Sequence, residues 1–153
     1  RSAEMSRDEL LGFIRSHRYA VEATVSPAAA PQAAVVGFGV TDRFEIVFDT
    51  TGSTRKARNL LANPAISLVI GGLDAGGERT VQVDGVADQP SGDELARLKE
   101  SYYRVFPDGV QRATSWPGLT YFRVRPRWIR YSDFSTPSPV IVELTAEDLP
   151  QVT

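Results

Sequence analysis

The feature that most restricts the fold of this chain is a series of strand-like segments joined by very short connections. Apolar alternation and β-branched residues predict strands over 19–26, 32–40 and 44–48. A proline-bounded turn over 27–31 and the tight connection Thr41–Arg43 join them. Parallel neighbouring strands would need a crossover of about a dozen residues or more. The segments are therefore predicted to form an antiparallel meander.

Similar patterns continue along the rest of the chain. Strands are predicted over 66–70, 79–87 and 119–134, the last one bent at Pro126, and a short final strand over 140–144. The glycine-rich stretch 71–77 is predicted to be a flexible turn. The expected fold class is mainly β with peripheral helices, arranged as an antiparallel barrel of about six strands.

Three helices are predicted between the strands. Ser6 and Glu9 form a capping box that opens the first helix, which runs to about residue 16. The second covers 55–62 and stops at Asn63-Pro64, and one apolar face is predicted to consist of Ala57, Leu60 and Leu61.

The third helix is predicted to open with a second capping box, Ser91 with Glu94. Its apolar residues recur at helical spacing, at Leu95, Leu98, Tyr102 and Val105. The following segment, 106–118, is predicted to be an irregular loop.

Length and charge restrict the possible partners. The chain has 153 residues, of which 42% are apolar, which suits one globular domain and leaves little room for two. Its 17 basic and 19 acidic residues give a net charge of −2, so no general attraction to nucleic acid or to an anionic membrane is expected. The apolar runs are far shorter than the roughly 20 residues that cross a bilayer. Binding to nucleic acid or to membranes is not predicted.

The absence of cysteine favours a reducing, cytoplasmic compartment and leaves no thiolate chemistry. One domain is expected over 6–145, followed by a polar tail over 146–153. The first residues lack the apolar stretch of a secretory signal, and residues 1–5 are interpreted as added residues followed by a natural start at Met5.

Common catalytic signatures are absent or incomplete. Gly37 and Gly39 begin a dinucleotide-binding pattern, but Asp42 stands where the third glycine should be and no helix follows. The carboxylates Asp93 and Glu94 lie at a helix start, where the helix dipole accounts for them. The single histidine, His17, follows a helix end and is interpreted as structural. No metal site and no catalytic residue are predicted.

The segment 50–58 is the best candidate for a binding site. Arg55, Lys56 and Arg58 crowd the start of a helix, where each cation opposes the macrodipole by about 0.3–1 kcal/mol. A bound anion such as phosphate would explain this arrangement, with hydroxyls offered by Thr50, Ser53 and Thr54. The alternative is a solvated basic face whose cations pair with carboxylates elsewhere.

Arginines alternate with aromatic residues in the late strand. Arg123, Arg125 and Arg127 would share one side if the period of two is kept. Such a row could bind a nucleic acid, or it could protect a sheet edge from unwanted pairing. The acidic net charge favours the edge interpretation.

Several of these segments together resemble the pyridoxamine 5′-phosphate oxidase-related family of FMN-binding split β-barrels. The resemblance covers roughly residues 6 to 134. Its most specific part is Arg55-Lys56 through Asn63-Pro64, supported by Thr80–Ala87 and by Trp128–Tyr131. It implies a six-stranded antiparallel Greek-key split barrel that forms a homodimer, with FMN held between the subunits.

The resemblance also implies which residues contact the cofactor. Arg55 and Lys56 match the phosphate-binding pair, Ser53 and Thr54 lie in the loop that completes the phosphate cradle, and Thr50 matches a threonine beside the ribityl chain. Further contacts to the flavin are implied along one strand, at single positions and from the partner subunit: Val35, Val36 and Gly37; Asp49 and Thr80; Trp128 and Arg130.

Departures from the oxidase itself affect the expected activity. The oxidase uses an Arg-x-His pair near its C-terminus, whereas this chain has no histidine after His17. Phe106 stands where the oxidase has the arginine of its substrate-binding set, and Ala34 replaces an arginine of the flavin-ring strand. True pyridoxamine phosphate oxidase activity is therefore not expected.

Three functions remain open at this stage. The first is an FMN-dependent oxidoreductase that transfers hydride or electrons to or from a small molecule. The second is a reductase of the same fold that uses a deazaflavin coenzyme, whose longer anionic tail would engage Arg58 and the late arginines. The third is a flavin-binding module without catalysis.

Overall fold

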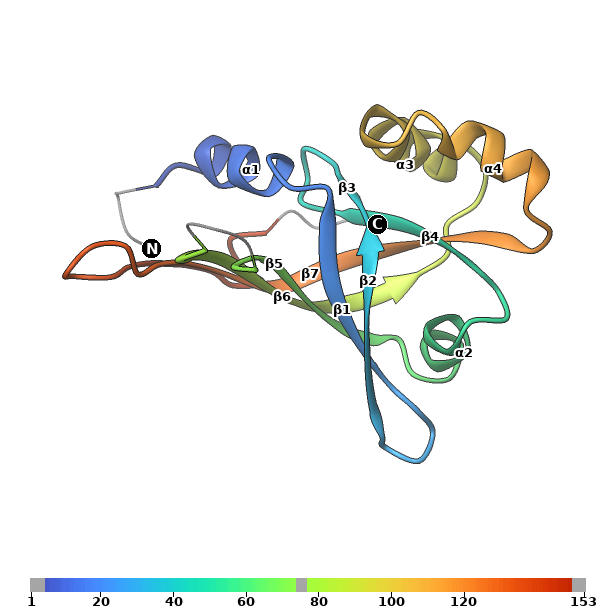
Figure 1. Ribbon diagram of the computed structural model, residues 1–153, viewed down its shortest axis with the longest axis horizontal. Coiled ribbons are helices and arrows are strands. Elements are labelled where there is room, and N and C mark those ends of the chain that lie inside the picture. The colour runs from blue at the N-terminus through green and yellow to red at the C-terminus, as the bar shows by residue number, and fades with distance from the viewer. Residues whose placement is uncertain (1–4, 74–76, 150–153) are drawn as a thin grey trace.

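A computed structural model describes residues 5–73 and 77–149 of the chain (Figure 1). The predictions made for residues 1–4, for the middle of the glycine-rich turn at 74–76 and for the end of the polar tail at 150–153 lie outside the described residues. Among the residues that are described, no helix has the length and apolar character needed to span a bilayer.

The described chain contains eight strand segments, all paired antiparallel in one sheet. They are β1 (Tyr19–Val25), β2 (Pro31–Gly37), β3 (Gly39–Val40), β4 (Ile46–Thr51), β5 (Ala65–Gly71), β6 (Arg79–Asp88), β7 (Leu119–Asp133) and β8 (Val140–Leu144). Their order is β2-β1-β5-β6-β7-β4-β3, and β8 pairs with β7. This antiparallel, mainly β architecture confirms the predicted split barrel.

The predicted count of six strands is too low. The strand expected over 32–40 is interrupted at Phe38, which separates β2 from β3. The next strand begins at Ile46 rather than at Phe44, because Phe44 has a positive φ of 61° and its amide donates to the carbonyl of Thr41 in a turn. The break at Phe38 therefore adds one strand to the predicted number. The turn at Phe44 makes the next strand start two residues later than apolar patterning predicts.

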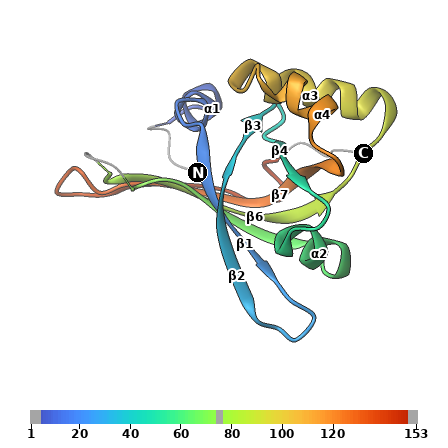
Figure 2. The same cartoon turned by 45° about the vertical axis from the view of Figure 1, so that its right-hand side comes forward.

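Within residues 5–73 and 77–149, four helices accompany the sheet, namely α1 (Arg7–Arg15), α2 (Arg55–Ala62), α3 (Gly92–Val105) and α4 (Gly109–Ser115). Figure 2 shows α3 and α4 together on one side of the sheet, whereas α2 lies on the other. The prediction of an irregular loop over 106–118 is wrong, because it contains α4. This helix has almost no apolar face, so periodicity could not reveal it; Arg112 instead binds Asp108 at 2.6 Å and Asp49 at 3.3 Å.

The two predicted capping boxes have different outcomes. Ser6 and Glu9 form theirs at the start of α1 as expected. At α3 the prediction is wrong, since the Ser91 side chain makes no capping hydrogen bond. The Glu94 carboxylate is instead held by Arg97 and Arg123, both at 3.0 Å, so a longer-range ion pair replaces the local cap.

The apolar core lies inside the curved sheet and beneath α1. Inward-facing residues from neighbouring strands, such as Leu68, Val83 and Ile129, meet Leu10 and Ile14 of the helix in one buried cluster. A second buried cluster fills the space between α3 and the opposite face of β4 and β7, and consists of Val47, Leu98, Tyr102, Phe106 and Tyr121. On α2 the predicted face is correct for Ala57 and Leu60, but Leu61 is exposed.

Arg123, Arg125 and Arg127 do not lie on an unpaired edge strand, because β7 pairs with β6, β4 and β8. Arg123 is buried and binds Asp88 at 2.6 Å and Glu45 at 3.2 Å. The pairing register shifts at Gly85 opposite the Pro126 region, and this irregularity ends the period of two before Arg127. The predicted single row of arginines is therefore wrong.

Candidate functional site

The loop between β4 and α2 forms a compact group of hydroxyls. Thr54 is the N-cap of α2, where its Oγ1 accepts a hydrogen bond from the amide of Ala57 at 3.3 Å. Thr50 Oγ1 lies 2.9 Å from Thr54 Oγ1, and Thr51 Oγ1 lies 3.4 Å from Ser53 Oγ. Four hydroxyls therefore lie together at the start of α2, those of Thr50, Thr51, Ser53 and Thr54. The first amides of this helix carry partial positive charge.

The cations at the start of α2 form no ion pair with an acidic side chain within the described part of the chain. Neither Arg55, Lys56 nor Arg58 forms an ion pair there, and the first turn of α2 contains no acidic residue. The alternative that carboxylates elsewhere neutralise them is therefore not supported. Thr50, Ser53, Thr54, Arg55 and Lys56 come together as one group, which we call the anion loop.

A buried acid lies near the anion loop. Glu22 of β1 is fully buried, and neither of its carboxylate oxygens has a hydrogen-bond partner among the described residues. Helix α2 packs on β1 beside it, where Asn59 Nδ2 donates to Thr24 Oγ1 at 3.1 Å. Burial raises the pKa of Glu22 to about 7, and the positive charge of Lys56 opposes that rise.

The predicted residues of β2 have different environments. Val35 is 65% exposed on the outer face of the sheet, Val36 is buried in the core, and Gly37 is half-buried. A side chain on Gly37 would begin 2.6 Å from the ring of Phe106, so this close approach requires glycine. Because β2 pairs only with β1 among the described strands, its second backbone edge forms no ladder hydrogen bonds with another strand.

Asp49 lies on the opposite face of β4 from Thr50. Its carboxylate accepts a hydrogen bond from the Tyr102 hydroxyl at 2.9 Å and one from Arg112 at 3.3 Å. Burial, together with the nearby Asp49 charge, raises the pKa of Tyr102 well above its usual value. Asp49 is therefore held against α3 and α4 and not within the anion loop.

Trp128, Arg130 and Thr80 lie apart from the anion loop as well. The register places Val21, Val69, Gln82 and Arg130 in one row on the outer face of the sheet, with Trp128 opposite Asp84 in the next row. Glu22 and Thr24 have the opposite orientation on β1 and face the interior beside α2. A single chain therefore does not bring Trp128 or Arg130 to its own anion loop.

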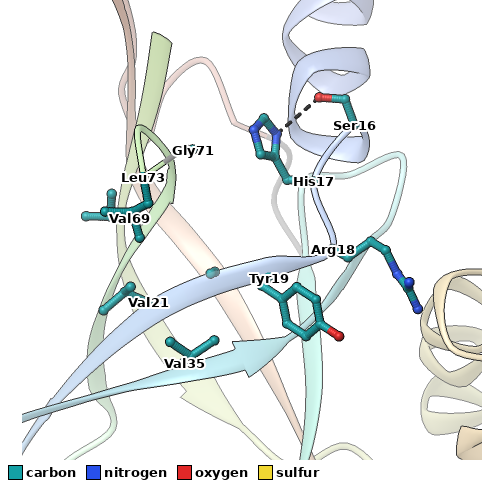
Figure 3. Close-up of a pocket in the computed structure, with 10 residues that line it drawn as sticks. Ser16, His17, Arg18, Tyr19, Val21, Val35, Val69, Gly71 and Leu73 are labelled. Atoms are coloured by element: carbon teal, nitrogen blue, oxygen red, sulfur yellow. Dashed lines mark hydrogen bonds between the residues drawn. The ribbon is translucent and has the colours of Figure 1, made fainter. Parts of the chain in front are cut away.

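An apolar pocket of about 390 Å³ opens on this outer face, next to the end of α1 (Figure 3). Its walls include exposed or half-exposed apolar side chains that were not predicted as site residues: Tyr19, Val21, Val69 and Leu73. Val35 is the one predicted residue that lines it. A sequence signal was present, because β1 carries apolar residues on both of its faces, which is typical of a strand whose second face is also covered.

His17 also lines this pocket. Its Nδ1 lies 3.0 Å from the carbonyl oxygen of Phe13 and 3.1 Å from the hydroxyl oxygen of Ser16. A proton on Nδ1 makes the contact with the Phe13 carbonyl a hydrogen bond and leaves the lone pair of the neutral ring on Nε2. Nε2 lies 3.3 Å from where a side chain on Gly71 would begin. Figure 3 shows His17 facing Gly71 and Leu73 across the pocket. The position after a helix end is as predicted, and the location in a pocket was not foreseen.

Comparison with known proteins identifies the family. Residues 6–133 match the sequence model described as pyridoxamine 5′-phosphate oxidase. The chain belongs to this family. No curated protein matches the chain closely enough to count as a relative.

Solved structures share the fold of this family member at low sequence identity. A heme-binding protein from Mycobacterium smegmatis has a TM-score of 0.79 at 20% identity; the match covers 96% of this chain and 61% of that protein's length. The heme storage protein HutZ from Vibrio cholerae has a TM-score of 0.68 at 20% identity. That match covers 78% of this chain and 88% of the HutZ chain. A pyridoxamine 5′-phosphate oxidase-related, FMN-binding protein from Nostoc punctiforme has a TM-score of 0.64 at 16% identity. That match covers 86% of this chain and 83% of the Nostoc chain.

Proposed function

We propose that this protein binds FMN and holds its phosphate in the anion loop. The observation that carries the proposal is the group of cations at the start of α2, none of which forms an ion pair with an acidic residue of the described chain. Phosphate supplies the missing charge and accepts hydrogen bonds from the loop hydroxyls and from the first helix amides. Arg55 provides a bidentate contact, and Lys56 provides a point charge.

The flavin ring would then lie along the open edge of β2. Backbone groups of β2 at Val35 and Gly37 would orient the ring, and the cofactor would supply the transfer of hydride or electrons to or from a small molecule. Pyridoxamine phosphate itself is not the proposed substrate. The oxidase's substrate-binding arginine is replaced by Phe106, which is buried against Tyr102 and Gly37.

A homodimer is part of this proposal. Trp128 and Arg130 share the outer face of the sheet with exposed Val35 and Val69, whereas the anion loop belongs to the other side. If the outer face of one copy packs near the β2 edge of another, each flavin receives its phosphate contacts from one chain and the Trp128–Arg130 contacts from the other. Exposed apolar residues on one face are typical of such an interface.

The direct test is the visible absorption spectrum of the purified protein, recorded before and after denaturation and with added FMN. The proposal expects a flavin band that is released on unfolding, or saturable binding of added FMN.

Arg55→Ala should weaken FMN binding by about 10- to 150-fold, which corresponds to the loss of roughly 1.5–3 kcal/mol for a charge-assisted contact. Arg43→Ala, which removes an exposed arginine from a distant turn, is the matched control. Equal FMN affinity in the two variants would contradict the assignment of the phosphate site.

A deazaflavin coenzyme is the variant of this proposal with a longer anionic tail. Arg58, exposed on the same turn as Arg55, is available to bind the additional charge. Titrating cofactor-free protein with FMN and with a deazaflavin coenzyme in parallel distinguishes the two. In the deazaflavin case, Arg58→Ala weakens deazaflavin binding and leaves FMN binding unchanged.

A second candidate function is heme binding, and it rests on His17. A heme-ligating histidine commonly donates its other ring N–H to a carbonyl, as the Nδ1 contact with Phe13 would allow, and needs an apolar cavity beside Nε2. Two structures of the same fold are described as proteins that bind or store heme. Titration with hemin should give a Soret band that shifts in His17→Ala and does not shift in Arg55→Ala. An unshifted band in the His17 variant would exclude this ligand.

A further inference from the structure

We propose that the pocket between α3, α4 and the beginning of β7 is a further binding site, which takes a small organic carboxylate and pairs its charge with Lys99. The two helices lie together on one side of the sheet (Figure 2). The pocket has a volume of about 220 Å³. Its walls come from the β6–α3 connection, from both helices and from β7, and include Pro90, Leu95, Lys99, Leu119, Thr120 and Tyr121.

Lys99 is the one charged residue among the described residues that line this pocket. Its ammonium lies 4.9 Å from the centre of the Tyr121 ring, and this contact holds the half-buried side chain against the wall. Lys99 forms no ion pair within residues 5–73 and 77–149. The helix spacing agrees with this, because no acidic residue stands three or four positions away on α3, where the residues are Leu95, Ala96, Tyr102 and Tyr103.

The acidic side chains of β4 and α3 do not pair with Lys99 either. Asp49 accepts hydrogen bonds from side chains of α3 and α4, and Glu94 is held by two arginines at 3.0 Å. Asp93 and Glu100 are exposed to solvent and make no ion pair with a described residue. A ligand that enters the pocket can therefore supply a negative charge to Lys99 without displacing an existing ion pair.

The other polar groups of the pocket have hydrogen-bond donors to offer. The Thr120 hydroxyl accepts a hydrogen bond from the Gln89 amide at 2.6 Å, so its own hydrogen remains available. The hydroxyls of Tyr103 and Tyr121 lie 2.7 Å apart, and only one of their two hydrogens is used between them. Tyr121 is buried, and burial raises the pKa of its hydroxyl, which is therefore protonated at neutral pH.

This combination of one cation and several donors favours a carboxylate. A carboxylate only accepts hydrogen bonds and carries one negative charge, which one ammonium matches. The apolar walls at Pro90, Leu95 and Leu119 suit an apolar body attached to that carboxylate. Because pockets for drug-sized ligands measure about 300–1,000 Å³, this smaller pocket suits a small acid.

The pocket is a neighbour of the anion loop and is independent of it. In the β4–β7 pairing, Thr120 lies opposite Thr50, and Leu119 lies opposite Thr51. The two sites therefore contact the same pair of strands, but none of the residues that line the pocket belongs to the anion loop. Carboxylate binding consequently does not require FMN.

A titration of the full chain with benzoate tests this proposal, and benzamide is the uncharged control ligand of similar shape. Two-dimensional amide NMR spectra should show saturable benzoate-dependent shifts at residues of the pocket, Leu95 and Tyr121 among them. Benzamide should bind more weakly by about tenfold or more, because it lacks the charge that pairs with Lys99.

Variants of the two lysines of the sequence provide a matched comparison. Lys99→Met keeps an aliphatic side chain and removes the charge, and should weaken benzoate binding by about tenfold or more. Lys56→Met removes the lysine of the anion loop and should bind benzoate as the wild type does. If Lys99→Met does not fold, Thr120→Val removes one donor and should weaken benzoate binding by roughly three- to tenfold.

Several results would overturn the carboxylate site. They are equal benzoate affinity in the wild type and in Lys99→Met, loss of benzoate binding in Lys56→Met alone, benzamide binding as tight as that of benzoate, and a wild type that does not bind benzoate. Each of them leaves the proposed FMN site standing, because that site is tested by the flavin band and by Arg55→Ala.

Discussion

Arg55 and Lys56 show how far single residues could be interpreted without coordinates. Their position at a helix start, next to hydroxyl-bearing residues, predicted an anion site, and the cap on α2 at Thr54 confirms the local geometry. Asp49 shows the limit. Its neighbour Thr50 faces the site, but alternation along β4 turns Asp49 towards Tyr102 and Arg112, which come from helices far along the sequence. Proximity in sequence could not reveal these partners.

The raised pKa of Glu22 predicts how the folding stability of the protein depends on pH. Its pKa is raised to about 7 in the folded protein, so between about pH 4.5 and 7 the folded state holds a proton that the unfolded state has lost. Folding stability from this group is fully present below that range and falls as the pH rises through it, by roughly 3 kcal/mol in total. In Glu22→Gln this loss should disappear.

Urea unfolding at pH 4.5 and pH 8 measures this difference. Glu100→Gln, which changes an exposed glutamate on α3, is the matched control and should follow the wild type at both pH values. If the wild type and Glu22→Gln lose the same free energy of unfolding between the two pH values, the buried carboxyl is already ionised at acidic pH.

At the scale of elements, α3 is held to the sheet by a group of buried ions. Glu45, whose side chain is fully buried, binds Arg97 at 2.8 Å and Arg123 at 3.2 Å, and Arg123 also binds Asp88 and Glu94. Burial alone would raise the pKa of Glu45, but the hydrogen bonds from Arg97 and Thr41 outweigh it and lower that pKa. The group joins α3 to β6, to β7 and to Glu45, which directly precedes β4.

Removing Arg123 should therefore weaken the whole domain. Arg123→Met leaves Glu45 and Asp88 without their shared cation and should lower the free energy of unfolding by about 3–5 kcal/mol. Arg127→Met removes an exposed arginine from the same strand and should change it by less than about 0.5 kcal/mol. Chemical denaturation at pH 7 compares the two, and a loss below about 1 kcal/mol for Arg123→Met would contradict this role.

The elements also show which parts of the fold the sequence could and could not predict. Alternation and short turns predicted the antiparallel sheet, because both depend on local chain geometry. The register shift opposite Pro126 was not predicted, because it depends on Gly85 of a different strand. A side chain there would begin 2.6 Å from the Arg125 carbonyl oxygen. Helix α4 was missed because ion pairs, and not apolar periodicity, stabilise it.

At the scale of the molecule, the proposed dimer should depend on the outer face of the sheet. Val69→Asp places a charge beside half-buried Val21, exposed Val35 and the other apolar residues of that face, and should shift the protein from dimer to monomer. Leu61→Asp alters an apolar residue on α2 that is even more exposed, at 69% against 41% for Val69, and should leave the assembly unchanged. Sedimentation velocity at micromolar concentration separates these cases. A Val69→Asp protein that remains dimeric would show that the interface does not lie on the outer face of the sheet.

The placement of Trp128 and Arg130 on the face opposite the anion loop has a consequence for mixed assemblies. In a symmetric dimer of this kind, an Arg55→Ala chain and a Trp128→Ala chain are each defective with their own copies. Together they would build one site that carries both lesions and one site that carries neither. Co-expressed, differently tagged chains should therefore regain tight binding of one flavin per heterodimer. Such complementation between two inactive alleles would show that the functional unit is shared between chains.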